Sequence, residues 1–439
     1  MNTLCVTGGR VLRPDGRVER ADIVVARDEG TIRAIGAPDE VANAVDAATE
    51  TLDAEESLVI PGLVNAHTHA AMTLFRGYAD DKPLDAWLRD DIWPIEAELT
   101  ADDIEAGTEL GVVEMIRSGT TAFADMYFAM DRVADVVERA GMRARLGHGA
   151  VTVGKDGDAA HADVEESLAV AKALDGAADG RVRTAFMPHS LTTVGEEYLR
   201  EGVADAREAG IPVHLHANET TDEVDPIVER RGERPIEYAA DLDALGRNDF
   251  FAHGVHLDET EIELLAAAGT AIVHCPASNM KLASGMAPVQ RLREAGVTVA
   301  LGTDGAASNN DLDLFDEMRD AAMLGKLAAE DAAAVPAEAA VEMATAAGAD
   351  ALGLPGGRIE PGAAADLAVV DLEAAHLTPV HDPVSHLAYA ARGSDVRHTV
   401  CDGRVLMRDR EVLTLDAETI RERASVAAAD LVARAEDGG

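Results

Sequence analysis

The chain has 439 residues, and its 81 acidic side chains against 38 lysines and arginines give a formal net charge of −43. Repulsion by phosphate groups excludes charge-driven binding to nucleic acids and to anionic membrane surfaces. Hydrophobic residues make up 47% of the chain and the acids are scattered along it, which argues against disorder. We therefore expect a folded protein with an acidic surface.

The basic residues are mostly arginine, since the chain has only five lysines, and aromatic residues make up 3%. This composition suggests adaptation to high salt, because at about 1 M salt the Debye length is only ~3 Å and an acidic surface no longer repels itself strongly. An ordinary acidic cytosolic protein is the alternative. The N-terminus shows no secretory signal, no apolar run is long enough to span a membrane, and three widely spaced cysteines indicate neither a disulfide framework nor a cysteine metal site. We predict a cytoplasmic protein.

The pattern along the chain predicts an α/β fold. Residues 3–60 contain short strands separated by turns, including a turn at Pro38-Asp39. From about residue 57, short apolar runs alternate with helical patterns, as a (β/α)8 TIM-type barrel requires. The runs are 58–65, 121–126, 142–149, 182–188, 211–216, 250–254, 270–274 and 297–302.

After residue 350 the β pattern returns, with a strand at 365–371, a hairpin at 399–412 and a final helix at about 417–435. We predict a barrel domain over residues 59–355. Residues 1–58 and 356–439 are predicted to pair into one small β-sandwich domain that includes the C-terminal helix and holds both termini.

Ionisable side chains gather at the ends of the predicted barrel strands, where active sites of such barrels lie. His67 and His69 share one face of the first strand end. Each residue alone could be a buried structural group, but the whole set would be costly without a purpose. Three histidine nitrogens and one carboxylate oxygen would suit a single metal ion with room for a water. The other strand ends carry His189, His216, His253, His274 and Asp304.

Several motifs around these residues resemble the amidohydrolase superfamily, and within it the methylthioadenosine/S-adenosylhomocysteine deaminases. The resemblance covers nearly the whole chain. The motifs are the segments 61–72, 216–219, 252–257, 276–282 and 302–310.

The resemblance implies that His67, His69, His216 and Asp304 bind one divalent metal ion, with zinc favoured and iron or manganese as alternatives. A two-metal site in this superfamily needs a carboxylated lysine on the fourth strand. Residues 182–188 contain no lysine, so a binuclear site is disfavoured.

The same resemblance assigns catalytic and substrate-binding roles. Glu219 would be the proton shuttle and would also touch the substrate, His253 would orient the attacking water, and Asp304 would accept a proton from that water. Glu96 would hold the ribose hydroxyls and His189 would contact the substrate. The reaction implied is hydrolytic deamination of adenosine-type nucleosides by a homo-oligomeric enzyme, a dimer or a tetramer.

Position 148 departs from the pattern of relatives suited to S-adenosylhomocysteine, which tend to have an arginine there and another in the next loop. Here His148 occupies the first place, and the loop offers only Lys155. We therefore expect His148 to favour substrates with a small 5′ group, namely 5′-methylthioadenosine, 5′-deoxyadenosine or adenosine, and S-adenosylhomocysteine stays open as a further substrate. Guanine deaminase and triazine hydrolase activities on the same site remain alternatives, and Glu96 argues against both because those substrates lack ribose. A catalytically dead scaffold is disfavoured because all four metal ligands and Glu219 are present.

Overall fold

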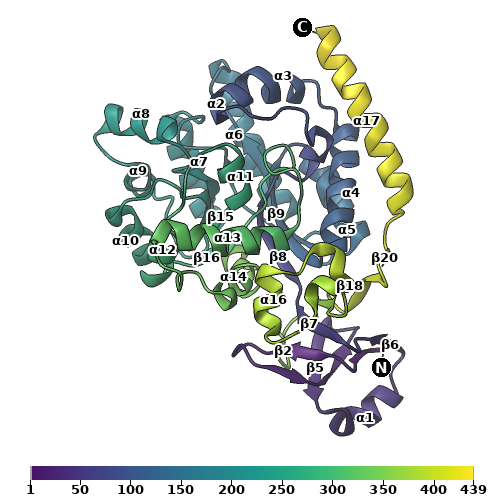
Figure 1. Cartoon of the computed structure of the whole chain (residues 1–439). Helices are drawn as coiled ribbons and strands as arrows, with labels where there is room; N and C mark the ends of the chain where they lie inside the picture. Colours follow the sequence, from purple (N-terminus) through teal and green to yellow (C-terminus); the bar gives the residue numbers. More distant parts are fainter. Residues whose placement is uncertain (1, 439) are drawn as a thin grey trace.

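The computed structural model describes residues 2–438 and confirms the α/β fold with a (β/α)8-type barrel (Figure 1). Its parallel strands form two sheets, ordered β11-β10-β9-β8 and β13-β14-β15-β16. The strands are β8 (Leu63–Thr68), β9 (Thr120–Tyr127), β10 (Arg143–Ala150), β11 (Val182–Thr184), β12 (Met187–Pro188), β13 (His214–Ala217), β14 (Phe250–His253), β15 (Ala271–His274) and β16 (Val299–Leu301).

The fourth predicted strand is divided into β11 and β12 because its residues pair with different neighbours. Ala185 donates its N–H to Leu146 on β10, whereas Phe186 forms a bridge with Val213 beside β13. This alternation joins the two parallel sheets along one seam. The barrel therefore remains continuous where the strand is interrupted.

The second seam brings β8 beside the chain that follows β16. The Asp304 N–H donates to the His67 carbonyl over 3.0 Å, and the Thr303 N–H donates to the Asn65 side chain over 3.0 Å. A Cβ atom on Gly302 would lie 2.9 Å from the His67 backbone, so only glycine permits this approach. The seam places His67, from the first barrel strand, beside Asp304, which follows the last one.

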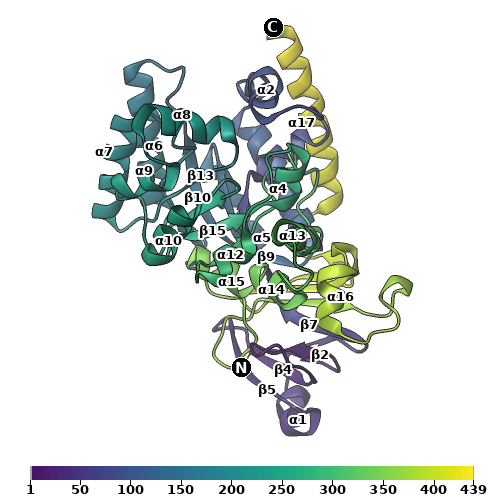
Figure 2. The same ribbon diagram turned by 60° about the vertical axis from the view of Figure 1, so that its left-hand side comes forward.

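Helices cover the outside of the barrel (Figure 2). An excursion after β8 contains η1 (Ala70–Phe75), α2 (Leu84–Trp87), η2 (Leu88–Ile92) and α3 (Trp93–Glu96). The remaining helices of this region are α4 (Ala101–Arg117), α5 (Met130–Ala140), α6 (Gly157–Leu174), α7 (Glu196–Ala209), α8 (Thr221–Arg231), α9 (Pro235–Asp241), α10 (Glu259–Ala268), α11 (Pro276–Lys281), α12 (Val289–Glu294), α13 (Leu314–Ala329), α14 (Ala337–Met343) and α15 (Ala346–Leu352).

Both ends of the chain contribute strands to a β-sandwich, which lies below the barrel in Figure 1. One sheet has the order β5-β4-β1-β6 and the other β20-β19-β18-β17-β7-β2-β3, and apolar side chains from both sheets form a shared core. The strands are β1 (Thr3–Thr7), β2 (Arg10–Leu12), β3 (Val18–Arg20), β4 (Asp22–Ala26), β5 (Thr31–Gly36), β6 (Glu50–Asp53), β7 (Ser57–Pro61), β17 (Leu367–Asp371), β18 (Val396–Cys401), β19 (Arg404–Arg408) and β20 (Glu411–Val412).

The helical segments that flank these strands are α1 (Pro38–Asp46), η3 (Ala375–Leu377), α16 (Pro383–Tyr389) and η4 (Gly393–Asp395). Helix α1 lies where the sequence pattern indicated a turn. Pro38 takes the first helical position, where its missing N–H costs nothing and its fixed φ suits a helix.

Helix α17 (Ala417–Gly438) does not belong to the sandwich, which corrects the sequence prediction for the last helix. It runs along α4 on the barrel, far from the N-terminus (Figure 1). Ala424 and Leu431 are buried in the main core, and Arg423 pairs with Glu109 of α4 over 2.9 Å. The division of the chain at residues 58 and 356 otherwise stays a prediction. No helix within residues 2–438 has the length and apolar character needed to cross a membrane.

Candidate metal centre and active site

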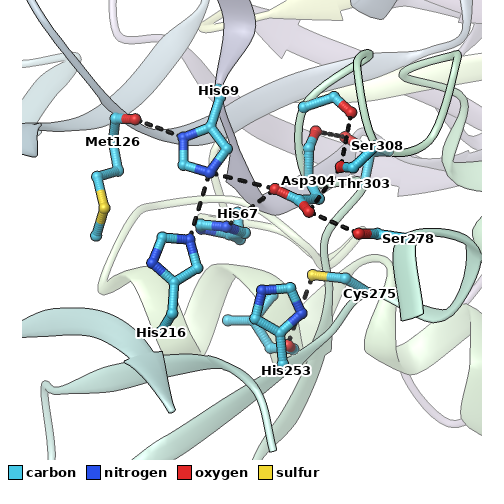
Figure 3. Close-up of polar contacts among 12 residues, drawn as sticks. His67, His69, Met126, His216, His253, Cys275, Ser278, Thr303, Asp304 and Ser308 are labelled. Atoms are coloured by element: carbon cyan, nitrogen blue, oxygen red, sulfur yellow. Dashed lines mark hydrogen bonds and ion pairs between the residues drawn. The ribbon is translucent and has the colours of Figure 1, made fainter. Parts of the chain in front are cut away.

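Four predicted ligands converge at the ends of the barrel strands (Figure 3). His67 and His69 come from the end of β8, His216 from β13, and Asp304 from the loop after β16. One ligand atom from each lies within 4.8 Å of the others. Asp304 Oδ1 is 3.2 Å from His69 Nε2 and 3.5 Å from His67 Nε2. The arrangement could hold one metal ion between three imidazoles and a carboxylate.

The Nδ1 atoms of the histidines point away from the centre and make hydrogen bonds that orient the imidazole rings. His69 Nδ1 lies 2.6 Å from the Met126 carbonyl, and His216 Nδ1 lies 2.6 Å from the His189 carbonyl. Because a carbonyl oxygen only accepts, each Nδ1 carries a hydrogen, and Nε2 is the ring nitrogen that faces the centre.

The Nδ1 atom of His67 also carries a hydrogen, and its contact with His214 shows why. His214 Nδ1 lies 2.7 Å from the Phe250 carbonyl, so it carries the hydrogen and leaves His214 Nε2 as an acceptor. That Nε2 is 2.9 Å from His67 Nδ1, which must therefore donate. The Nε2 lone pair of His67 consequently faces the centre as well.

Two serine hydroxyls orient the carboxylate of Asp304. Ser278 and Ser308 donate to Oδ2 over 2.7 and 2.8 Å (Figure 3). Oδ1 is left to face His67 and His69.

The chemistry of this cluster fits a divalent cation. His67 Nε2 is buried and makes no hydrogen bond with any residue of 2–438. Burial lowers the pKa of His67 to about 4, which keeps the imidazole neutral and able to act as a ligand. Burial also acts to lower the pKa of His69, but the adjacent Asp304 carboxylate outweighs it and raises that pKa to about 9. The cluster thus stabilises positive charge.

Glu219 and His253 lie beside the cluster. Glu219 Oε2 is 3.7 Å from His253 Nε2, and burial raises the pKa of Glu219. His253 Nδ1 is 3.0 Å from Asn279 Oδ1, so the amide holds the ring with Nε2 turned toward Glu219. A carboxyl group of raised pKa beside a metal-binding cluster is suited to take up and release protons.

A cavity of about 520 Å³ opens over the cluster. Its lining includes the predicted substrate residues Glu96 and His189. Glu96 accepts a hydrogen bond from the Tyr127 hydroxyl over 2.8 Å. Burial raises the pKa of Glu96 to about 6, although the bond from Tyr127 opposes this shift. The same lining includes His69, His216, Glu219, His253 and Asp304.

His148 takes a different place from the one expected. Within the described chain it lies behind the cavity wall, where its ring contacts Phe128 at 5.7 Å between centroids and its Nε2 lies 3.0 Å from Asp163 Oδ1. Phe128 and Asp163 line the cavity, and His148 does not. The His148 side chain points toward helix α6, and the expected contact of His148 with the substrate stays a prediction.

Sequence and structure comparisons agree on the family. Residues 58–406 match the profile of the amidohydrolase family. The chain belongs to that family.

This amidohydrolase has close relatives along its whole length. It is 68% identical over 437 residues to a 5-methylthioadenosine/S-adenosylhomocysteine deaminase of Haloarcula marismortui, covering 100% of each chain. It is 46% identical over 422 residues to a 5′-deoxyadenosine deaminase of Methanosarcina mazei, covering 96% of each. Among solved structures, an adenosine deaminase of Xanthomonas campestris with bound zinc superposes with a TM-score of 0.91 at 36% identity, covering 98% of each chain.

Four residues of this amidohydrolase contact the site residues and were not singled out from sequence. Ser278, Asn279 and Ser308 lie inside the motifs 276–282 and 302–310. Their place in these motifs was the sequence feature that could have identified them. Tyr127 ends β9, and only its place at a strand end pointed to the barrel mouth.

Proposed function

We propose that this amidohydrolase hydrolyses adenosine-type nucleosides to the inosine analogue and ammonia. The observation that carries the proposal is that Glu96 shares one cavity with Glu219 and the metal-binding cluster. A carboxylate at that place can accept hydrogen bonds from both ribose hydroxyls. The names of the relatives, which include deaminases of adenosine, 5′-deoxyadenosine and 5-methylthioadenosine, support the same reaction.

In the proposed mechanism, the four residues of the cluster bind a metal ion. His67, His69, His216 and Asp304 would hold the metal, for which we propose zinc with iron or manganese as alternatives. When bound, such a metal supplies an activated water at neutral pH.

The other residues move protons and orient the reactants. Asp304 accepts the proton that the water loses, and His253 orients the water toward the purine carbon that bears the amine. Glu219 protonates the adjacent ring nitrogen, then takes the remaining proton of the added hydroxyl as the carbonyl forms and passes it to the departing ammonia. The proton that Asp304 accepted finally returns to Glu219. Glu96 and His189 hold the nucleoside so that this carbon faces the water. One water is consumed and one ammonia released for each nucleoside.

Guanine deaminase or triazine hydrolase activity is the competing proposal. An atrazine chlorohydrolase of Arthrobacter aurescens shares the fold at 24% identity and a TM-score of 0.89. Triazines and guanine lack ribose, so they offer no ribose hydroxyls for Glu96 to bind. Glu96→Ala is expected to lower kcat/KM for adenosine by about 10²-fold or more, since it removes two hydrogen bonds to a charged acceptor.

Ammonia release from adenosine and 5′-methylthioadenosine tests the function directly. Activity should be lost on chelation and return with about one equivalent of Zn²⁺, with guanine and aminotriazines as control substrates. Turnover of the free bases with no turnover of nucleosides would overturn the proposal. We also propose that the enzyme is a cytoplasmic homo-oligomer, a dimer or tetramer, which light scattering in molar KCl would check.

A further inference from the structure

Glu317 is a buried acidic residue that the proposed mechanism does not use. It lies on α13, and its side chain is completely buried. Its hydrogen-bond partners within residues 2–438 are two N–H groups, and neither belongs to a lysine or arginine. A buried carboxyl group without a cation beside it is costly, so its hydrogen bonds are the place to look for a purpose.

Each oxygen of Glu317 binds a different segment beside the metal-binding cluster. Oε2 accepts from the Ala277 N–H over 3.3 Å, in the first turn of α11. Oε1 accepts from Asn309 Nδ2 over 2.6 Å, and the same Nδ2 donates to the Thr303 carbonyl over 2.8 Å. One carboxyl group on α13 therefore joins the segment after β15 to the segment after β16.

The two residues that Glu317 binds are sequence neighbours of Ser278 and Ser308, whose hydroxyls orient Asp304. These hydroxyls donate to Asp304 Oδ2 over 2.7 and 2.8 Å from separate segments of the chain (Figure 3). A shift of either segment would draw a hydroxyl away from Oδ2 and allow the carboxylate to turn. Glu317 fixes both segments at once.

We propose that Glu317 is a positioning residue of the metal centre, which holds Ser278 and Ser308 where their hydroxyls fix the Asp304 carboxylate. Among the described residues, Glu317 neither lines the cavity nor belongs to the metal-binding group, so it acts through the two segments. This inference rests on the proposed metal site and does not depend on which nucleoside the enzyme takes. A residue that only stabilised the fold would change the free energy of unfolding and leave metal affinity alone.

Glu317→Gln keeps the size of the side chain but leaves one oxygen for two N–H donors. We expect the affinity for Zn²⁺, measured by competition with a chromophoric chelator, to fall by about 10–100-fold, as when an orienting partner of a ligand is lost. Co²⁺ bound in place of zinc reports the ligand geometry through its visible spectrum, which should change as well.

Glu109→Gln is the matched control. Glu109 is also a buried carboxylate on a helix, but it pairs with Arg139 of α5 and Arg423 of α17 over 2.9 Å each. Its replacement should lower the melting temperature and leave both the Zn²⁺ affinity and the Co²⁺ spectrum unchanged. Wild-type Zn²⁺ affinity and an unchanged Co²⁺ spectrum in a folded Glu317→Gln variant would overturn the inference.

A background without the two hydroxyls tests whether Glu317 acts through them. In a Ser278→Ala/Ser308→Ala variant there is no hydroxyl left to hold, so adding Glu317→Gln should change the Zn²⁺ affinity by less than about threefold, because effects that share one route do not add. A further loss of about tenfold or more in that background would mean that Glu317 acts by another route, and the inference would be wrong.

Asn309→Ala gives a test that does not depend on the folding of Glu317 variants. It removes the bonds of this partly buried amide to Glu317 and Thr303, so the Zn²⁺ affinity should fall by about tenfold, but not where Ser308 is already alanine. Unchanged affinity in Asn309→Ala would reject the inference while the metal site stands. A wild-type protein that binds neither Zn²⁺ nor Co²⁺ would refute the metal site and this inference together.

Discussion

Tyr127 donates its hydroxyl hydrogen to Glu96 Oε1 over 2.8 Å at the wall of the cavity. Burial raises the pKa of Tyr127 well above its ordinary value, so the hydroxyl stays a donor throughout the physiological range. One oxygen of Glu96 is thereby held, and the carboxylate has a defined orientation. The hydrogen bond between Tyr127 and Glu96 links strand β9 to the excursion after β8.

The ionisation of Glu96 should therefore set the pH dependence of KM. Its pKa is raised to about 6, and the ionised form is the one that accepts from two hydroxyls. KM for adenosine should be constant above this pKa and rise as pH falls through it; bound metal would lower the pKa, so the rise is expected at or below pH 6. Tyr127→Phe removes a bond that favours the ionised form and should move the rise to higher pH. A KM profile that is unchanged in Tyr127→Phe would contradict this role.

Glu219→Gln keeps the shape of the side chain and removes its acid–base function. We expect kcat to fall by about 10²–10⁴-fold, the usual contribution of a positioned acid or base. Metal content and melting temperature should match the wild type, because Glu219 is no member of the metal-binding group. Elemental analysis and steady-state kinetics would check both, and retained turnover would reassign the proton shuttle.

Ser278→Ala and Ser308→Ala should weaken metal binding through Asp304. Each hydroxyl donates to Oδ2 and keeps Oδ1 turned to the histidines. Loss of such an orienting partner costs about 10–100-fold in metal affinity. Competition with a chromophoric chelator would measure this. Ser425→Ala is a matched control, since that exposed serine bonds only within α17 and its loss should leave the affinity unchanged.

Arg143→Met should destabilise the protein at the junction of barrel and sandwich. The Arg143 guanidinium on β10 binds Asp366 and Asp402 over 2.8 Å each, and its removal strands the buried Asp366 carboxylate. The expected loss is about 3–5 kcal/mol of unfolding free energy. Arg183→Met provides the control, because its pair with Asp175 is nearly half exposed and worth under about 1 kcal/mol. Urea titration at fixed KCl would compare them, and equal losses would refute the interpretation.

The acidic surface predicts that salt stabilises the fold. The net charge of −43 repels itself at low ionic strength, and molar salt screens that repulsion. The midpoint of thermal unfolding should rise between 0.1 and about 3 M KCl. The relative from Haloarcula marismortui, at 68% identity, comes from a halophile and agrees with this expectation. A midpoint that stays flat across this range would exclude adaptation to high salt.

Local pattern was enough to predict much of the molecule. Apolar runs located the barrel strands because parallel strands are buried on both faces, and polar residues at their ends located the mouth. Motif resemblance then named His67, His69, His216 and Asp304, which the structure brings within 4.8 Å. The sequence pattern did not show which part of the fold the last helix, α17, packs on. Segment 417–438 would show the same pattern whether it packed on the sandwich or on α4. Tertiary contacts, among them the salt bridge from Arg423 to Glu109 and the burial of Leu431, place it on α4.

The sequence by itself determined the family, the positions of the barrel strands and the residues of the metal-binding group, because these depend on motifs, periodicity and spacing along the chain. Only the tertiary structure decided which partner each polar group has. The proton on His67 is placed through His214 and the Phe250 carbonyl, and Lys155 is offset by Asp163. Such pairings depend on distances of a few ångströms between separate elements, which a linear pattern does not encode.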